Sequence, residues 1–290
     1  MSATIIDGTS LADQIKADVH LRIQQLQKTG CHVRLTAVLI GSTSAGELYA
    51  KRQGEACRAV GIEYELLTLP ADADNRRVHD IFHSLNTDPR VTGIMLHLPV
   101  PGHLNPIELQ YLIDPTKDVE GVNPANIGYV VYGQTLIAPC TALAAVELIK
   151  STNVPIRGAE VVMVGASQIV GKPIALLLMD LMATVTTCHI ATRDLAAHTR
   201  RADILVVAAG KANLIAAEHV REGAVVIDVG INRITLPDGS KKTVGDVDFD
   251  AVAKKAAFVT PVPGGVGPMT VAMLLKNTLR SAELLASAKA

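Results

Sequence analysis

The sequence predicts an α/β protein in which parallel sheets are covered by helices, arranged in two successive blocks. Strand-like segments rich in Val, Ile and Leu alternate with helix-like segments throughout the chain. Hydrophobic residues make up 49% of the 290 residues and aromatic residues only 3%, a composition that suits strands buried under helices. The alternation is interrupted near residues 140–158 and then starts again, which indicates two blocks with right-handed crossovers.

The first block is expected to contain three strands separated by helices. Its strand segments are apolar, and the last one is stopped by Pro99 and Pro101, since proline cannot donate to a strand ladder. The expected elements are a strand at 34–41, a helix at 45–60, a strand at 62–69, a helix at 78–85 and a strand at 91–98.

The second block repeats this pattern more regularly. A helix at 141–151 is expected to connect the blocks, and the helical periodicity from Thr270 to Ala290 predicts a C-terminal helix that packs back across both. The segment 235–242 contains Pro-Asp-Gly and is expected to be a turn. The other expected elements are strands at 159–165, 184–190, 202–210 and 224–232 and a helix at 169–182.

Composition argues against several classes of protein. The 27 basic and 28 acidic residues give a net charge of −1, so we expect no nucleic-acid partner. The four cysteines are far apart without a CxxC pair, so we expect neither a zinc knuckle nor a disulfide scaffold, and no metal. The first residues lack the features of a signal peptide, and no apolar run is long enough for a membrane span. We therefore expect a cytoplasmic protein.

The segment VVMVGASQIVGKP predicts a phosphate-binding turn. It places Gly165 at the end of a strand and Gly171 in the first turn of a helix, where small residues let the backbone approach a pyrophosphate. The spacing GxSxxxG departs from the usual GxGxxG. The next strand ends in Cys188-His189-Ile190, without the acidic residue that holds a ribose in many NAD sites. The pattern therefore indicates a dinucleotide but does not choose between NAD and NADP.

A family resemblance rests on motifs that span almost the whole chain. The segment TPVPGGVGPMTVAMLLKNT at 260–278 resembles the signature of the methylenetetrahydrofolate dehydrogenase/cyclohydrolase (FolD) family. Other matching segments follow in the family order: IDGTSLA, HLPVP, KDVEGVNPANIG, PCT, VGASQIVGKP, ATVTTCH, VIDVGIN and VGDVDF. The resemblance implies a homodimer of two-domain chains, with a folate cleft between the domains.

The resemblance also implies an activity and a separate role for each domain. The family oxidises methylenetetrahydrofolate by hydride transfer to a nicotinamide and usually hydrolyses the methenyl product to formyltetrahydrofolate. An N-terminal parallel α/β folate-side domain would comprise residues 1–140 plus the helix 270–290, and a Rossmann-like dinucleotide-binding domain residues 141–269. This implies an oxidoreductase of one-carbon metabolism with a small-molecule folate substrate.

The resemblance assigns residues to two pockets. Beside Tyr49, folate contacts are implied for Val100, Pro101, Pro263, Gly264, Gly265 and Pro268. Cofactor contacts are implied for Thr141, Gly165, Ala166, Ser167, Ile169, Gly171, Ile190, Ala209, Gly210 and Ile231.

Three departures from the family pattern fall among the expected catalytic residues Tyr49, Gln53, His97 and Glu120. The family's lysine four residues after the tyrosine is here Gln53, its glutamine before Leu-Pro is His97, and its second Asp of Asp-Val-Asp-Gly is Glu120. The family's Pro-Ala-Ser is also changed, to Ser44-Ala45-Gly46. Lys51 and Arg52 cannot replace the lysine, because they point elsewhere on a helix. We therefore expect the hydrolysis to be weak or lost.

The cofactor pocket departs as well. Ala166 and Ile190 stand where the family commonly has groups that contact the adenosine 2′-phosphate, which favours NAD, although Arg193 could compensate. Three alternatives remain open. His97 could supply the missing base in a fully bifunctional enzyme, since imidazole titrates near neutrality. The chain could act on another one-carbon carrier or an imine. It could also be a non-catalytic folate-binding paralogue.

Overall fold

The computed structural model describes residues 2–41 and 44–288, with the side chains of Ser44 and Ala45 left out. The chain divides into two compact units. The large-sheet unit comprises residues 1–13 and 141–270, and the small-sheet unit comprises residues 14–140 and 271–290. The sheets are parallel and helix-covered in both, which confirms the predicted α/β class.

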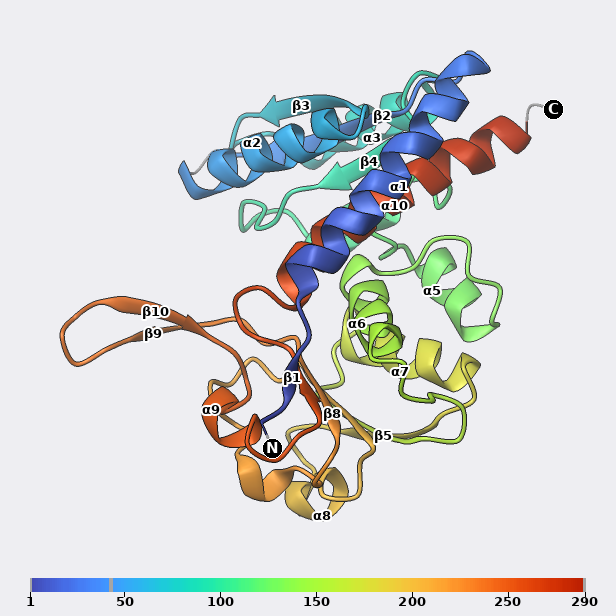
Figure 1. Cartoon of the computed structure of the whole chain (residues 1–290). Coiled ribbons are helices and arrows are strands. Elements are labelled where there is room, and N and C mark those ends of the chain that lie inside the picture. Colours follow the sequence, from blue (N-terminus) through green and yellow to red (C-terminus); the bar gives the residue numbers. More distant parts are fainter. Residues whose placement is uncertain (1, 42–43, 289–290) are drawn as a thin grey trace. The chain divides into compact units, whose positions relative to one another are not determined.

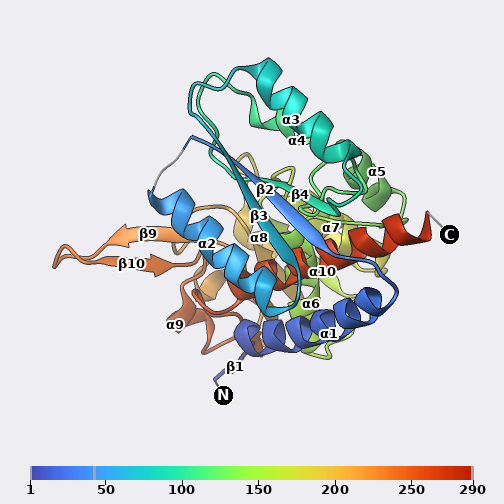
Figure 2. The same ribbon diagram turned by 90° about the horizontal axis from the view of Figure 1, so that it is seen from above.

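The small-sheet unit contains a three-stranded parallel sheet in the order β3-β2-β4. Figure 2 shows the three strands side by side, with α2 running along β3. Phe82 and Val78 of α3 pack with Val38 and Ile40 of β2 in a buried cluster on one face. The elements are α1 (Gly8–Lys28), β2 (Arg34–Ile40), α2 (Ser44–Ala59), β3 (Glu63–Leu69), α3 (Asn75–Thr87), β4 (Gly93–Leu96), α4 (Pro106–Tyr111), α5 (Pro124–Val131) and α10 (Val266–Ser287), of which α1 and α10 begin in the other unit.

The large-sheet unit contains a six-stranded parallel sheet in the order β1-β11-β8-β7-β5-β6. Its strands β5, β7 and β8 are almost fully buried, as expected for a sheet covered on both faces. The strands are β1 (Thr4–Ile5), β5 (Glu160–Val164), β6 (Thr184–Cys188), β7 (Ile204–Val207), β8 (Val225–Asp228) and β11 (Phe258–Val259). The helices are α6 (Cys140–Ser151), α7 (Gly171–Asp180), α8 (Leu195–Thr199), α9 (Phe249–Val252) and the short 3₁₀ turn η1 (Ala217–His219).

A hairpin of β9 (Asn232–Thr235) and β10 (Lys241–Val244) projects from this unit in Figure 1. Its connection contains the expected Pro-Asp-Gly turn, closed by a bond from Leu236 N to Ser240 O of 2.8 Å.

The boundary of the units differs from the expected one at the N-terminus. Residues 1–13 were expected in the folate-side domain but belong to the large-sheet unit. The reason is that β1 pairs in parallel with β11, with Thr4 opposite Phe258. No helix in the described part of the chain is both long and apolar enough to cross a membrane.

Candidate active site

The candidate site lies at the carboxyl edge of the small sheet. His97 directly follows β4, and its amide continues the ladder by donating to Val38 O at 2.9 Å. The chain segment that carries Glu120 runs alongside β4, with Ile94 bridged to Asp118 and Ile94 N donating to Lys117 O at 2.8 Å. Ligands of open α/β sheets bind at this edge, so the topology brings His97 and Glu120 to the place where a substrate is expected.

Asp118 organises the loop that holds Glu120. Its carboxylate is completely buried and accepts bonds from Gly121 N (3.1 Å), Asn123 N (2.7 Å) and Asn126 Nδ2 (3.0 Å). Asn123 in turn caps α5 by accepting from Ala125 N at 2.9 Å. The KDVEGVNPAN segment is therefore a loop fixed by its own hydrogen bonds, and these bonds of the neighbouring residues set the position of Glu120.

Helix α2 supplies the other two expected residues. Tyr49 and Gln53 are four residues apart and share a face, whereas Lys51 and Arg52 are exposed on other faces, as predicted. The Tyr49 ring meets the His97 ring edge-on, with centroids 5.8 Å apart. The structure thus brings Tyr49 and His97 together. The changed segment 44–46 starts α2, but the side chains of Ser44 and Ala45 lie outside the described residues.

Gln53, one of the expected catalytic residues, is buried, at 5% exposure. Both ends of its amide are engaged. Nε2 donates to Met95 Sδ at 2.9 Å, and Oε1 accepts from the Tyr64 hydroxyl at 3.2 Å. The same hydroxyl lies 3.4 Å from His97 Nε2. Gln53 is therefore fixed inside the unit.

Tyr64 is the site residue that sequence reasoning missed. It lies on β3 opposite Leu35 of β2, and Leu35 is also opposite Gly93, so Tyr64, Met95 and His97 share one face of the sheet. Its ring packs on Gly54, where an added Cβ would lie 2.7 Å from a ring carbon. The sequence contained one signal, the glycine in the middle of α2. Glycine costs about 1 kcal/mol relative to alanine inside a helix, so its presence there indicates that another group packs closely against the helix.

Burial makes the site uncharged near neutral pH. It raises the pKa of Glu120 to about 8, with a further contribution from the charge of Asp118, while a backbone hydrogen bond from Leu96 acts in the opposite direction. Burial also lowers the pKa of His97 and raises that of Tyr49. At pH 7 the site therefore presents a carboxylic acid, a neutral imidazole and a phenol.

Cys140 is a buried thiol beside the loop that carries Glu120. Burial raises the pKa of its thiol well above the ordinary value, and Sγ donates to Val119 O at 3.3 Å. A thiol that stays protonated is not a nucleophile.

The predicted phosphate-binding turn lies at the carboxyl edge of the large sheet, where the strand order reverses between β5 and β7. Gly165 has φ of 113°, and an added Cβ would lie 2.1 Å from Ala208 O at the end of β7. A Cβ on Gly171 would lie 2.0 Å from Gly165 O. Asp246 accepts from Ala209 N at 2.6 Å and Gly210 N at 2.9 Å, which holds the adjacent turn. This cradle of small residues fits a dinucleotide.

The remaining expected cofactor residues all belong to the large-sheet unit. Ser167 Oγ accepts from Gly171 N at 3.3 Å at the start of α7. Ile190 is fully exposed in a turn after β6 that is closed by His189 N donating to Thr192 Oγ1 at 2.9 Å. Ile231 is also exposed. Ala166, Ile169 and Thr141 belong to the same unit and are not fully buried.

The expected folate contacts are divided between the units. Val100 and Pro101 belong to the small-sheet unit, whereas Pro263, Gly264, Gly265 and Pro268 belong to the large-sheet unit. Pro263, Gly264 and Gly265 lie between β11 and α10, and Pro268 lies in the first turn of α10. Gly8 packs directly on Gly265, because a Cβ added to Gly8 would lie 1.9 Å from Gly265 O. Their folate roles stay predictions.

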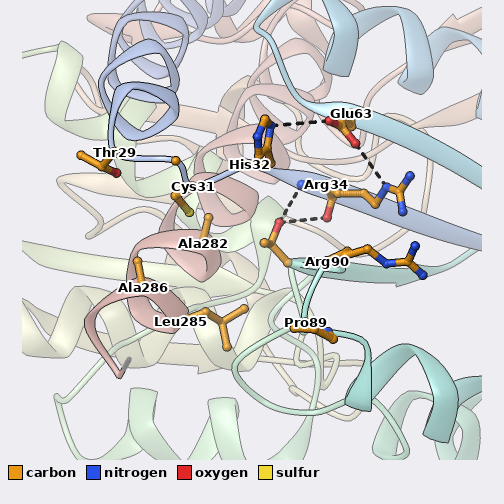
Figure 3. A pocket seen from close by; sticks show the side chains of 12 residues that line it. Thr29, Cys31, His32, Arg34, Glu63, Pro89, Arg90, Ala282, Leu285 and Ala286 are labelled. Atoms are coloured by element: carbon orange, nitrogen blue, oxygen red, sulfur yellow. Dashed lines mark hydrogen bonds and ion pairs between the residues drawn. The ribbon is translucent and has the colours of Figure 1, made fainter. Parts of the chain in front are cut away.

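A separate cavity of about 640 Å³ lies at the opposite, amino edge of the small sheet. Figure 3 shows Arg34 and Glu63, the first residues of β2 and β3, on one side and Leu285 of α10 on the other. Its polar side chains pair with one another: Glu63 lies 3.4 Å from Arg34 Nε and 3.8 Å from His32 Nδ1. We therefore assign no part of the reaction to this cavity.

The chain matches known proteins over both of its units. Residues 6–120 match the catalytic domain of the tetrahydrofolate dehydrogenase/cyclohydrolase family, and residues 139–286 match its NAD(P)-binding domain. A relative called bifunctional protein FolD 2, from Mesorhizobium japonicum, is 48% identical over 274 residues, covering 94% of this chain and 90% of the relative.

Solved structures agree with this assignment. A bifunctional FolD enzyme from Campylobacter jejuni has a TM-score of 0.93 and 41% identity, covering 98% of this chain and 99% of its own. The Trypanosoma brucei enzyme, solved with NADP and an inhibitor, has a TM-score of 0.92 and 36% identity over the full length of both chains.

Proposed function

This chain belongs to the tetrahydrofolate dehydrogenase/cyclohydrolase family, and we propose that it oxidises 5,10-methylenetetrahydrofolate to 5,10-methenyltetrahydrofolate with NAD or NADP. The observation that carries this proposal is the cradle formed by Gly165, Gly171 and Ala208 at the switch point of the large sheet. A nicotinamide dinucleotide bound there supplies the hydride acceptor.

The chemistry suits the uncharged site. The hydride leaves the methylene carbon with its bonding pair, and the flanking nitrogens stabilise the cation that remains, so the step needs orientation rather than proton transfer. In the proposed arrangement the Tyr49 and His97 rings, which hold each other edge-on, orient the folate. Glu120, protonated at neutral pH, donates a hydrogen bond without adding charge.

We further propose that the hydrolysis of the methenyl product is slow. In that step water adds to the methenyl carbon, one of its protons passes to a base, one carbon–nitrogen bond breaks, and the released nitrogen takes up the other proton to give the formyl product. A group must accept the proton. The Gln53 amide does not titrate, and both of its ends already bond to Met95 and Tyr64. General acid–base assistance contributes about 10²–10⁴ in rate, and the chain should lack most of it.

A second candidate is a bifunctional enzyme in which His97 accepts the proton. The observation that favours it is that His97 is neutral near pH 7 and held by both Tyr49 and Tyr64. The two candidates differ only in the hydrolysis rate, so one assay separates them.

The test follows the absorbance of methenyltetrahydrofolate in a buffer where spontaneous hydrolysis is slow. The wild-type protein should accelerate its loss little, and Gln53→Lys combined with His97→Gln should accelerate it more. Rapid hydrolysis by wild type that disappears in His97→Ala would establish the second candidate. If methylenetetrahydrofolate reduces neither NAD nor NADP, the dehydrogenase proposal fails, in favour of another carrier or a non-catalytic paralogue.

For the cofactor we propose NAD. Ala166 and the fully exposed Ile190 offer no charged or hydroxyl partner for a 2′-phosphate. Arg193 follows the turn at 189–192 and is the nearest basic residue along the chain, so it is the residue through which NADP would be retained.

A further inference from the structure

The three polar side chains Gln53, Tyr64 and His97 form a chain of contacts whose direction can be deduced. It starts at Met95, because a thioether sulfur accepts a hydrogen bond but cannot donate one. The amide end of Gln53 that lies 2.9 Å from Met95 Sδ must therefore be the NH₂ group. The carbonyl end of Gln53 consequently faces Tyr64, at 3.2 Å.

The Tyr64 hydroxyl has a single proton, and the Gln53 carbonyl can only accept. The hydroxyl therefore donates to Gln53 Oε1, and only its lone pairs remain for His97 Nε2 at 3.4 Å. A contact to a lone pair is favourable only when Nε2 carries a hydrogen. In a neutral imidazole, a hydrogen on Nε2 leaves Nδ1 as the nitrogen with the free lone pair.

We propose that Tyr64 is a positioning residue that fixes His97 in the Nε2–H tautomer, so that Nδ1 is the acceptor His97 offers to the folate or to a water. Gly54 contributes to this positioning, because only a residue without a Cβ leaves room for the Tyr64 ring against α2. The inference rests on the proposed function only in treating this edge as the folate site; the tautomer itself follows from the contacts.

The primary test is nitrogen NMR of protein labelled with ¹⁵N-histidine, which distinguishes the protonated ring nitrogen from the unprotonated one. The His97 signals are assigned by their loss in His97→Gln. In the wild-type protein at pH 8, His97 should be a single Nε2–H tautomer. In Tyr64→Phe and in Met95→Leu, which remove the lone pair and the fixed end of the chain respectively, both tautomers should be populated. Tyr132→Phe, at an exposed tyrosine, is the control and should match the wild type.

A kinetic measurement separates positioning from general damage to the fold. Tyr64→Phe should raise the KM for the folate several-fold and leave the KM for the dinucleotide unchanged, whereas partial unfolding would lower kcat alone. Finding His97 as the Nδ1–H tautomer, or unchanged in Tyr64→Phe, would overturn the proposal. If the NMR result holds but neither dinucleotide is reduced, the proposed function fails while the tautomer assignment stands.

Discussion

At the scale of single residues, two of the positions at which the sequence departs from the family pattern share a contact with one side chain outside the motifs, Tyr64. Gln53 and His97 both contact Tyr64, and Gly54 makes room for its ring. The changes at 53 and 97 are thus physically coupled, because each side chain uses the same hydroxyl. Their effects on activity should be non-additive, as is usual for residues that share a hydrogen-bond partner.

The raised pKa of Glu120 predicts how stability depends on pH. The folded protein keeps this proton up to about pH 8, whereas an ordinary glutamate releases it near 4.5. Between these values the unfolded chain binds fewer protons than the folded one, so the free energy of unfolding falls as pH rises, by up to about 1.4 kcal/mol per pH unit. Glu120→Gln should remove this slope.

The check is the difference in melting temperature between pH 5.5 and 8. The difference should be larger in the wild type than in Glu120→Gln by several degrees, since about 1 kcal/mol corresponds to a few degrees in a protein of this size. Glu55→Gln, on an exposed position of α2, is the matched control. Equal slopes in all three proteins would show that Glu120 is ionised in the fold.

The cofactor pocket predicts the effect of a second substitution. Ala166→Arg should raise kcat/KM for NADP relative to NAD by roughly tenfold or more, because a hydrogen bond to a charged group contributes about 1.5–3 kcal/mol. The measurement is initial-rate kinetics with each dinucleotide. A wild-type protein that already prefers NADP tenfold would contradict the prediction, and loss of that preference in Arg193→Ala would locate its source.

At the scale of elements, the site loop is held in place from the helices behind it. Asn277 of α10 donates from Nδ2 to Val119 O, just before Glu120, and to Ala138 O, two residues before Cys140, both at 2.9 Å. Lys117 donates from Nζ to the carbonyl oxygens of Leu85, Asn86 and Asp88 at the end of α3, at 3.0, 2.7 and 2.8 Å. Both sides of the loop are therefore anchored by buried polar bonds.

Removing the Asn277 amide should loosen this loop. Asn277→Leu removes the amide donor from Ala138 O and leaves Val119 O with only the weak thiol donor of Cys140, and an unpaired buried group costs about 1–3 kcal/mol. We expect a lower urea midpoint and a raised KM for the folate, with Lys276→Ala, at the neighbouring less buried position, as the control. An unchanged midpoint would mean that another donor or water replaces the amide.

The elements predicted best were those with continuous apolar runs. Strands β2, β5, β7 and β8 are such runs, and each was expected within a few residues of its position. Strands β1 and β11 have two residues each and carry no periodic signal, since only their pairing defines them. Helix α1 was missed although Ile15, Val19 and Ile23 recur every four residues, so its signal was present.

The residues of the candidate site also differ in how far they could be predicted from the sequence. The residues Tyr49, Gln53, His97 and Glu120 could be found because they lie within recognisable motifs. Tyr64 was not identified, because its role depends on the register of β3 against β2, which does not follow from periodicity. Gly54 indicates only that some group packs closely on α2 and does not say which one.

At the scale of the whole molecule, the oligomeric state stays a prediction, because the structure contains a single chain. The resemblance implies a homodimer formed through the dinucleotide-binding domain. Light scattering at micromolar concentrations should give twice the chain mass of 30.6 kDa. The single-chain mass across this range would contradict the prediction. The cytoplasmic location expected from the sequence also stays a prediction.

The pairing of β1 with β11 has a consequence for how the protein is made. Thr4 leaves the ribosome early, but its partner Phe258 follows roughly 250 residues later, and α10, which completes the small-sheet unit, comes last of all. Neither unit can therefore finish folding until translation is nearly complete. The N-terminal strand therefore stays unpaired on the nascent chain until β11 has been synthesised.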